Sequence, residues 1–541
     1  MEFELVEPNK ILLKENGKVN EDETLDYRAY EIFEDDTGIR EKKLIPTAYY
    51  RFLKMFTMVT YDQTKWETTC RHLVGEKIDR VLFQFQREAI YRMIKQKRCM
   101  NACSPGLGKS IQALACLSYF SGNATNNLIA CPSYLTTNWM NEVRKWLPGD
   151  VADTAVVIGK AGKKEIEGAT KTLLFTPGIK IISYDLLANI LGKRGGQPTR
   201  SYFNTVILDE SHFIKDGKTT RYKNIAPYIK SCKQMYLLTG TPSPNRNKEL
   251  YTQFSLIQPS VFYQYSTFAF RYCDAKYDKF NRFDDRGMSN VKELSFFMSY
   301  LAIRLRREDH VDDLPSEIRE KIIIEPPTHS KRFSTQKKKF MEELKNIETS
   351  ESAMFKVQSM ASEMFRLTAT IKEKPVIEYL KGYVADPDLE KTILFCKHQT
   401  MLSAVTTFLK DMGLGFIEIS GQTDKGVRTG LIDTFLNDPT CMFAALTTGT
   451  CATGLNIVPI RKMIFLELEW TPSTLEQCQC RINRIGGAKN LHYIYLICAH
   501  TLDDMVFRKL EKKTALITDV VDAGKQYGDF TFQQENKKQK T

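Results

Sequence analysis

The sequence lacks the features that mark membrane-spanning and secreted proteins. It contains no run of about 18 apolar residues, the length that crosses a bilayer as a helix. Its first residues, Met1-Glu2-Phe3-Glu4, include acids where a secretion signal needs a basic start and an apolar core. We therefore expect no membrane partner and an intracellular location, which would be the nucleus in a eukaryote and the cytoplasm or virion for a bacterial or viral protein.

Metal-binding cysteine motifs are also missing. None of the 13 cysteines forms a Cys-x-x-Cys pair, and Cys478 and Cys480 have no second pair or nearby histidine at zinc-ligand spacing. Others, such as Cys116 and Cys396, lie within apolar segments. We expect buried, reduced thiols and no structural zinc.

The composition is that of a large globular protein. The 541 residues exceed the size at which one core keeps growing, so two or more domains of roughly 100 to 200 residues are expected. Hydrophobic residues make up 42% of the chain and charged residues 26%, which argues against a fibrous or disordered class. The net charge of +12 is compatible with binding a phosphate backbone, although many proteins reach it without contacting nucleic acid.

A candidate phosphate-binding loop occupies residues 103–110, between a short apolar run and a helix expected over 111–120. Glycines let the backbone approach phosphate oxygens, and the helix N-terminus presents unpaired N–H groups. Lys109 would reach the terminal phosphates and Ser110 would hold magnesium. Because the strict pattern has a glycine where this chain has Cys103, a chance Gly-Lys-Ser turn remains an alternative.

Two carboxylates end the apolar, β-branched strand expected over 205–208. Open α/β sheets place ligands at the carboxyl ends of their strands. We predict that Asp209 holds magnesium through water and that Glu210 orients the attacking water, since phosphoryl transfer depends on positioning and charge neutralisation. The alternative is that the two acids cap the next helix.

Two further segments carry polar side chains suited to a nucleotide. Gln86 precedes the loop by about twenty residues, and its amide can donate to and accept from an adenine edge. The alternative for Gln86 is a solvated helix residue. The apolar strand over 234–238 ends in Thr239, Gly240 and Thr241. These hydroxyls could relay the nucleotide state to a neighbouring surface, or belong to an ordinary turn.

Strand and helix patterns alternate through this part of the chain. The strand over 127–131 is followed by a helix with Trp139, Val143 and Trp146 at i, i+4 and i+7. We interpret the two tryptophans as core residues rather than ligand-stacking ones. The alternation predicts a parallel sheet covered by helices on both faces.

The same alternation returns after Lys374 and predicts a second α/β lobe. Its strands are expected over 391–396, 415–420, 442–446 and 463–466. Within it, Arg481 and Arg484 are three residues apart and are expected to share one helical face. Paired guanidinium groups suit the charge that develops on a transferring phosphoryl group, whereas isolated surface arginines would be unremarkable.

Three motifs resemble, in order and spacing, those of superfamily-two helicases of the Swi/Snf type. They are residues 106–112, Asp209-Glu210-Ser211-His212 and 238–242. Residues 210–215, 249–253 and 271–276 look most like the annealing-helicase (HepA-related) branch, whose members use ATP to move on duplex DNA and rewind or remodel branched structures.

The chain departs from this family at two places. Cys103-Ser104-Pro105 stands where the family usually has two acids and a hydrophobic residue. In the segment 477–487, which is similar to the family's last motif, Cys480, Asn483 and Gly487 replace the usual aspartate, histidine and glutamine. Both arginines and Gln477 are kept.

The resemblance implies an α/β fold of two tandem RecA-like lobes, each a parallel sheet flanked by helices. The expected ranges are 1–75 for a small N-terminal accessory region, 76–265 for the ATP-binding lobe, 266–372 for helical protrusions and a linker, 373–525 for the C-terminal lobe and 526–541 for a disordered tail.

It also implies one composite site for ATP and Mg²⁺. The residues expected to catalyse hydrolysis are Lys109, Asp209, Glu210, Arg481 and Arg484. The residues expected to bind the nucleotide are Gln86, Cys103, Ser104, Pro105, Gly106, Leu107, Gly108, Lys109, Ser110 and Gln477, with Ser110 and Asp209 on the metal. His212, Thr239, Thr241 and Gly454 are expected to couple hydrolysis to movement.

The function implied is that of a monomeric, ATP-dependent translocase on double-stranded or forked DNA, which remodels or anneals branched DNA in replication or repair. One alternative is a motor that remodels transcription complexes or nucleosomes, with replication or transcription proteins as partners. Another is a nucleic-acid-binding scaffold without hydrolysis. The intact Lys109, Glu210, Arg481 and Arg484 argue against the scaffold.

Overall fold

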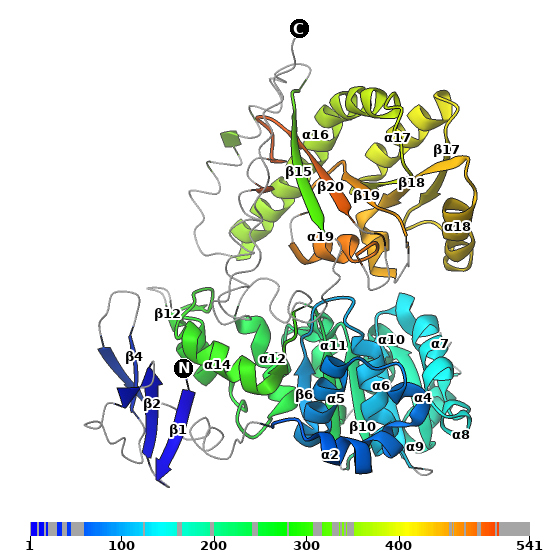
Figure 1. The fold of residues 1–541 in the computed structure, drawn as a ribbon. Coiled ribbons are helices and arrows are strands. Elements are labelled where there is room, and N and C mark those ends of the chain that lie inside the picture. The colour runs from blue at the N-terminus through cyan, green and yellow to red at the C-terminus, as the bar shows by residue number, and fades with distance from the viewer. Residues whose placement is uncertain are drawn as a thin grey trace. The chain divides into compact units, whose positions relative to one another are not determined.

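The computed structural model describes most of the chain between Val59 and Asn483 and shorter pieces on either side (Figure 1). The described residues are 2–7, 10–15, 18–19, 30–34, 40–44, 59–122, 125–159, 165–194, 198, 200–240, 247–277, 281–306, 316–326, 335, 338–339, 342, 351–453, 457, 459–469, 472–483, 488, 490–503 and 506–507. They divide into two compact units, one up to Arg306 and one beyond it, and each unit has its own parallel sheet and apolar core.

Antiparallel strands and short helices precede the first large sheet. The strands are β1 (Glu2–Glu7), β2 (Lys10–Glu15) and β3 (Lys18–Val19), which form one small sheet, and β4 (Tyr30–Glu34) and β5 (Arg40–Leu44), which form a pair. The helices are α2 (Gln63–Lys65), a π-helical turn (Trp66–Cys70), α3 (Arg71–Val74) and α4 (Glu76–Asp79).

A seven-stranded parallel sheet organises the first unit, with the order β14-β6-β11-β10-β7-β9-β8. Its strands are β6 (Arg98–Asn101), β7 (Asn126–Cys131), β8 (Val156–Ile158), β9 (Gly178–Ser183), β10 (Thr205–Asp209), β11 (Gln234–Leu238) and β14 (Ala302–Ile303). Val206, Ile207 and Leu208 of the central β10 are fully buried, as in sheets covered on both faces.

Helices flank this sheet (Figure 1). They are α5 (Gln84–Gln96), α6 (Lys109–Phe120), α7 (Thr136–Trp146), α8 (Gly149–Ala152), α9 (Ile166–Phe175), α10 (Tyr184–Arg194), α11 (Thr220–Ile229) and α12 (Lys248–Ile257). The two helices nearest the predicted site differ in burial. α6 is buried through its apolar centre, whereas α7 buries only Trp139 and Val143 and leaves its polar face outward.

Residues 266–306 pack onto the first unit. They form most of α13 (Tyr265–Tyr272), the hairpin strands β12 (Lys276–Tyr277) and β13 (Phe283–Asp284), α14 (Val291–Leu301) and β14. The sequence predicted only helical protrusions and a linker over 266–372, but β14 joins the first sheet beside β6, and β15 (Glu317–Ile324) joins the second sheet. The two residues of β14 directly follow α14. The sequence therefore contains no separate apolar run of strand length from which β14 could be predicted.

A buried ion pair joins α13 to α14. Arg271 Nη2 lies 2.5 Å from Glu293 Oε2, and Arg271 Nε donates to Oε1 at 2.7 Å. The hydroxyl of Tyr272 also donates to Glu293 Oε1, at 2.6 Å. Only 8% of Arg271 and 1% of Glu293 is exposed, so each charge depends on the other for its stabilisation.

A six-stranded parallel sheet organises the second unit, with the order β15-β20-β19-β16-β18-β17. Besides β15, its strands are β16 (Thr392–Cys396), β17 (Gly415–Ile419), β18 (Cys441–Thr447), β19 (Lys462–Phe465) and β20 (Leu491–Cys498). The flanking helices are α16 (Glu351–Val384), α17 (Gln399–Asp411), α18 (Lys425–Asn437) and α19 (Pro472–Gln479).

Two parallel sheets flanked by helices confirm the predicted α/β class with tandem lobes. Every cysteine with a described side chain is free of a disulfide, and all of these except Cys480 are buried. Among the described residues, no helix has the length and apolar character needed to span a membrane.

We predict that Glu293→Gln strongly destabilises the first unit, because it removes the negative partner of the buried Arg271–Glu293 ion pair. The expected loss is about 3–5 kcal/mol in the free energy of unfolding. Asp185→Asn is the matched control, since Asp185 also pairs with an arginine, Arg221, but is 78% exposed. It should change stability by less than about 1 kcal/mol. Urea denaturation of both variants measures the difference, and equal losses would contradict the prediction.

Candidate nucleotide-binding site

The loop after β6 has the shape of a phosphate cradle. Gly106 and Gly108 have φ angles of 86° and 79°, in the left-handed region that glycine adopts most readily. Gly108 is the N-cap of α6, so the loop delivers its backbone directly into a helix N-terminus. A Cβ atom at Gly108 would lie 2.5 Å from Gln86 Nε2, so the close approach also requires glycine there. Backbone N–H groups at such a terminus favour anions.

Lys109 turns back over this loop. Its Nζ donates to the carbonyl oxygen of Cys103 at 2.8 Å and lies 3.4 Å from that of Ser104. The ammonium group is therefore held at the concave side of the loop, where phosphate oxygens would bind. Its predicted contact with the terminal phosphates stays a prediction.

Hydrogen bonds from three buried side-chain amides stabilise the loop. Gln86 Nε2 and Gln112 Nε2 both donate to the carbonyl oxygen of Leu107, at 3.0 and 2.9 Å. Asn101 Nδ2 donates to Gln112 Oε1 at 2.7 Å, and Gln86 Oε1 accepts from the N–H of Phe83. Gln86 thus holds the loop through Nε2 and caps the N-terminus of α5 through Oε1, and its predicted contact with adenine stays a prediction.

Asp209 ends β10 at the same edge of the sheet. The indole N–H of Trp139 donates to its Oδ2 at 2.8 Å, and the N–H of Glu210 donates to its Oδ1 at 3.0 Å. Burial and, to a smaller extent, the nearby Glu210 carboxylate raise the pKa of Asp209 to about 7. The hydrogen bond from Trp139 and the charge of Lys109 oppose it.

Glu210 is a non-glycine residue in the left-handed region, with φ 49° and ψ 54°. This conformation turns the chain sharply from β10 into the 3-10 turn Ser211–Ile214. Its Oε2 lies 3.2 Å from Nδ1 of His212. Strained backbone at a strand end is typical of functional sites.

The strand β11 brings the next polar turn to the same edge. The N–H of Thr239 donates to the carbonyl oxygen of Asn101 at 3.1 Å, which fixes the end of β11 beside the start of the loop. A Cβ atom at Gly240 would lie 3.1 Å from Pro105 Cγ and 3.9 Å from Lys109 Nζ. Thr239 and Gly240 are thus close to the phosphate loop, whereas Thr241 lies outside the described residues.

The donors at this edge fit magnesium. Mg²⁺ takes oxygen ligands and keeps several waters. Asp209 offers a carboxylate and Ser110 a hydroxyl at the first turn of α6. The buried negative charge of Asp209 beside Glu210, which raises its pKa, is also the kind of charge that a divalent cation offsets.

Residues 302–306 contribute to the loop, which sequence reasoning did not predict. The N–H groups of Ala102 and Ser104 donate to the carbonyl oxygens of Ile303 and Leu305, at 2.9 and 3.0 Å. Arg304 Nη1 donates to the carbonyl oxygens of Ala102 at 2.6 Å and Gly240 at 3.3 Å. The segment that leaves the first unit is therefore hydrogen-bonded along the phosphate loop. The only sequence signal was the short apolar pair Ala302-Ile303.

In the second unit, α19 ends at Gln479, and Arg481 lies in the turn that follows. Because Arg484 lies outside the described residues, the expectation that Arg481 and Arg484 share one helical face stays a prediction. The carbonyl oxygen of Arg481 accepts from the N–H of Ile457 at 3.3 Å, which ties this turn to the loop after β18. Gln477 lies on α19, whereas Arg484 and Gly454 fall outside the described residues.

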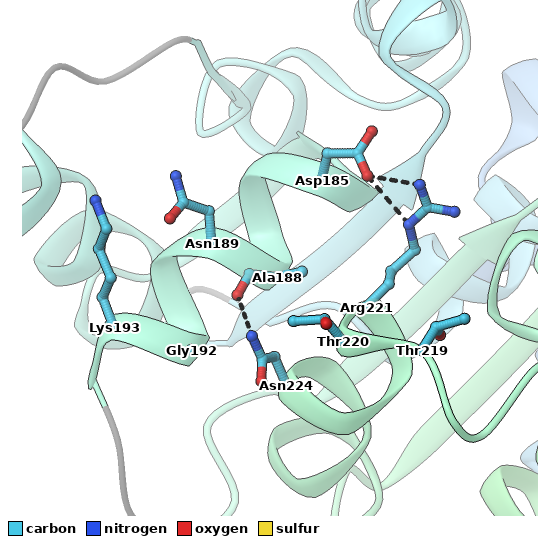
Figure 2. Close-up of a pocket in the computed structure, with 9 residues that line it drawn as sticks. All are labelled: Asp185, Ala188, Asn189, Gly192, Lys193, Thr219, Thr220, Arg221 and Asn224. Carbon is cyan, nitrogen blue, oxygen red and sulfur yellow. Dashed lines mark hydrogen bonds and ion pairs between the residues drawn. The ribbon is translucent and has the colours of Figure 1, made fainter.

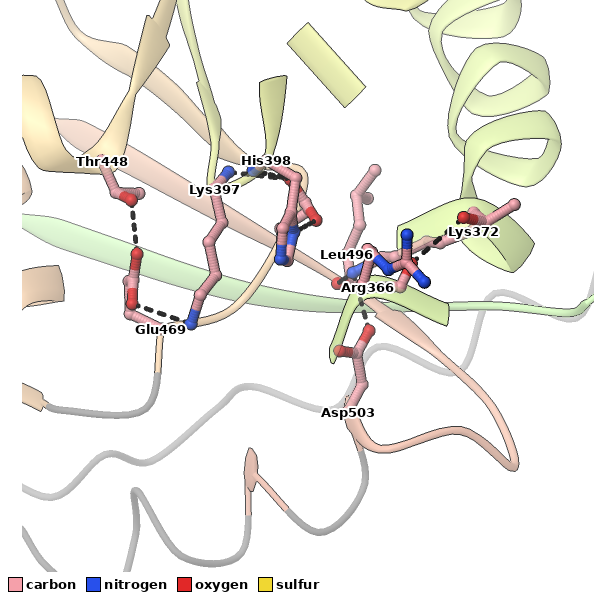
Figure 3. Close-up of polar contacts among 10 residues, drawn as sticks. Arg366, Lys372, Lys397, His398, Thr448, Glu469, Leu496 and Asp503 are labelled. Carbon is pink, nitrogen blue, oxygen red and sulfur yellow. Dashed lines mark hydrogen bonds and ion pairs between the residues drawn. The ribbon is translucent and has the colours of Figure 1, made fainter. Parts of the chain in front are cut away.

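Charged side chains that the sequence analysis missed follow the strands of the second sheet (Figure 3). Glu467, after β19, accepts from the backbone N–H groups of Lys397 and His398 at 2.8 and 2.9 Å and from the His398 ring at 2.7 Å. Burial favours a higher pKa for Glu467, but these hydrogen bonds outweigh it and lower the pKa. Lys397 Nζ pairs with Glu469 at 3.1 Å, and Thr448 donates to Glu469.

A polar pocket of about 630 Å³ lies between α10 and α11 (Figure 2). Arg221 crosses it to Asp185, with Nη2 and Nε at 2.6 and 3.2 Å from Oδ1, and Asn224 donates to the carbonyl oxygen of Ala188. No predicted site residue lines it. The pocket is therefore separate from the phosphate loop.

Two protein-family models together match most of this chain. The family model of the SNF2-related domain matches residues 58–375, and the helicase conserved C-terminal domain matches residues 375–486. The chain is 31% identical over 438 residues to the human DNA annealing helicase and endonuclease ZRANB3, covering 80% of this chain and 40% of that protein. It is 29% identical over 449 residues to the SWI/SNF-related matrix-associated actin-dependent regulator of chromatin subfamily A-like protein 1 of Xenopus tropicalis, covering 82% of this chain and 45% of that protein.

The chain thus spans less than half the length of these two curated relatives. Among solved structures, the SWI2/SNF2 ATPase core of Sulfolobus solfataricus in complex with dsDNA is 20% identical and has a TM-score of 0.37, covering 82% of this chain and 93% of that one. The SNF2-related model covers more than half of the chain by itself. The chain therefore belongs to the SNF2-related family of helicase-like ATPases, as its motifs predicted.

Proposed function

We propose that this chain is an ATP-dependent translocase on double-stranded DNA that remodels or anneals branched DNA. The observation that carries the proposal is the convergence of the phosphate loop, Asp209 with Glu210, and the Thr239-Gly240 turn at one edge of the first sheet. The human relative is named a DNA annealing helicase, which supports a DNA substrate. The net charge of +12 is compatible with it.

In this proposal the first unit binds ATP and prepares the attack. The loop N–H groups and Lys109 bind its phosphates, and Ser110 and Asp209 hold Mg²⁺, which neutralises charge on the phosphate oxygens. Glu210 orients the attacking water. The two carboxylates have different partners, since Glu210 lies 3.2 Å from His212 and Asp209 accepts from Trp139.

The second unit completes the proposed reaction. Arg481 and Arg484 supply guanidinium groups that stabilise the charge on the transferring phosphoryl group. Because they belong to a different unit from Lys109, hydrolysis in this proposal depends on both units. That dependence would convert hydrolysis into movement along the duplex.

The remaining predicted roles belong to the same proposal. Gln86 and Gln477 contact the nucleotide, and four residues couple its state to movement: His212, Thr239, Thr241 and Gly454. The expected partner is duplex or forked DNA, bound by a monomer. Replication or transcription proteins are further candidate partners.

We predict that duplex DNA stimulates ATP hydrolysis and that Lys109→Ala abolishes the stimulated rate, because the phosphates lose their cationic contact. Phosphate release is measured without DNA and with single-stranded, duplex and forked DNA. Lys171→Ala, an exposed lysine on α9, is the matched control and should behave as wild type. Equal rates in Lys109→Ala and wild type would show that the loop is not the ATP site.

The same assay separates the alternative functions. Stimulation only by a polymerase complex or by nucleosomes would favour a remodeller of those assemblies. Tight duplex binding with no phosphate release by the wild type would favour the scaffold.

We predict that Arg481→Ala and Arg484→Ala each lower kcat by roughly 10³ while nucleotide binding is largely kept, because the arginines act on the transition state. Arg461→Ala is the control, since Arg461 belongs to the same unit and pairs with Glu390 at the surface. Single-turnover hydrolysis and equilibrium binding of ADP separate the two effects. A rise in the Kd for ADP that accounts for the whole loss would contradict a transition-state role.

We predict that Gly108→Ala weakens nucleotide binding, because alanine disfavours a φ of 79° and its Cβ would displace Gln86. The strain is about 1–3 kcal/mol. Gly122→Ala is the control, since the nearest atom to its Cβ is 4.0 Å away and it needs no left-handed backbone. Calorimetric titration with ADP should show weaker binding only for Gly108→Ala.

A further inference from the structure

Trp139 connects α7 to the carboxylate of Asp209. The residue is 1% exposed and lies on the buried face of α7, which fits the core role expected from the sequence. Its indole nitrogen, however, is not surrounded only by apolar groups, because it donates to Asp209 Oδ2 at 2.8 Å. A buried indole N–H needs a partner, and here that partner is the proposed magnesium ligand.

This hydrogen bond is one of three that fix Asp209. The N–H of Glu210 donates to Oδ1 at 3.0 Å, and the hydroxyl of Tyr184 donates to the backbone carbonyl oxygen at 2.7 Å. One donor on each carboxylate oxygen sets the plane of the group, and each oxygen keeps a second lone pair. The carboxylate is therefore oriented before any cation reaches it, which is the arrangement that lowers the cost of ligand ordering.

The donor from Trp139 is neutral, which matters at this position. A lysine or arginine there would pair with Asp209 and cancel the charge that attracts a cation. An indole N–H orients the carboxylate and leaves its negative charge in place.

We propose that Trp139 is a positioning residue that orients the Asp209 carboxylate to hold Mg²⁺ with the bound nucleotide. The inference rests on the proposed function, in which Asp209 is a magnesium ligand. It assigns to α7 a direct influence on metal binding.

The same helix offers a matched comparison. Trp146 also donates its indole N–H to a carboxylate, Glu142 Oε2, at 2.7 Å. Glu142 lies on α7 itself, one turn away, and belongs to no predicted site. Replacing either tryptophan by phenylalanine removes the same donor from the same helix, but only Trp139 reaches Asp209.

The test compares Trp139→Phe with Trp146→Phe in the full chain. Binding of ADP carrying an N-methylanthraniloyl fluorophore is followed while Mg²⁺ is titrated. We expect Trp139→Phe to raise the half-saturating Mg²⁺ concentration about tenfold, as for a lost hydrogen bond to a charged group. Trp146→Phe should leave it unchanged. Melting curves of both variants are recorded with EDTA. A lower melting temperature for Trp139→Phe with an unchanged Mg²⁺ midpoint would reduce Trp139 to a core residue and overturn the inference.

A measurement on the wild type does not depend on how well the variant folds. The sequence has four tryptophans, so protein labelled with ¹⁵N-tryptophan gives four indole signals. Single Phe variants of Trp66, Trp146 and Trp470 assign three of them and leave the signal of Trp139. With ADP present, adding Mg²⁺ should shift that signal more than the one from Trp146. No shift of the Trp139 signal would overturn the inference.

The two proposals fail in different ways. If wild-type nucleotide binding does not depend on Mg²⁺, the proposed function fails at Asp209 itself. If nucleotide binding by the wild type depends on Mg²⁺ and Trp139→Phe has the same half-saturating Mg²⁺ concentration, only the proposed role of Trp139 is contradicted.

Discussion

Parallel pairing in register is the constraint on which the candidate site depends. Asn101 of β6 pairs with Leu238 of β11, and Leu238 pairs with Asp209 of β10. The last residues of three strands from distant parts of the sequence therefore lie at one level. The phosphate loop, the Thr239-Gly240 turn and the two acids each follow directly from this row. A slip of one residue in β10 would turn Asp209 to the other face and separate it from the loop.

Buried polar side chains stabilise the conformation of the phosphate loop at this edge of the sheet. Asn101 donates to Gln112, and Gln112 and Gln86 each donate to the carbonyl oxygen of Leu107. Each amide is buried, so losing one partner would leave another unsatisfied at a cost of about 1–3 kcal/mol. Gly106 and Gly108 permit the left-handed backbone of the phosphate loop. The hydrogen bonds from the amides favour one loop conformation among those that glycine allows.

The sequence predicted the parts of this site that depend on strand ends. Apolar runs that lead into the phosphate loop, into Asp209 and into Thr239 sufficed, because parallel sheets collect such ends at one edge. It did not predict the role of Arg304, since two strand residues after a helix leave no periodic signal. Nor did it show that α19 stops at Gln479, because the pattern of apolar residues continues to Ile482, which is buried in the following turn.

Both sheets have acidic residues just after their strands, but the pKa values of Glu467 and Asp209 shift in opposite directions. In the second sheet, Glu469 pairs with Lys397, and hydrogen bonds lower the pKa of Glu467. In the first sheet, burial and the neighbouring Glu210 carboxylate raise the pKa of Asp209, although the N–H groups of Trp139 and Glu210 donate to its carboxylate. Hydrogen bonds from neutral donors hold a carboxylate in place without cancelling its charge. In the proposed function, Mg²⁺ would offset the buried charge of Asp209 at the first sheet.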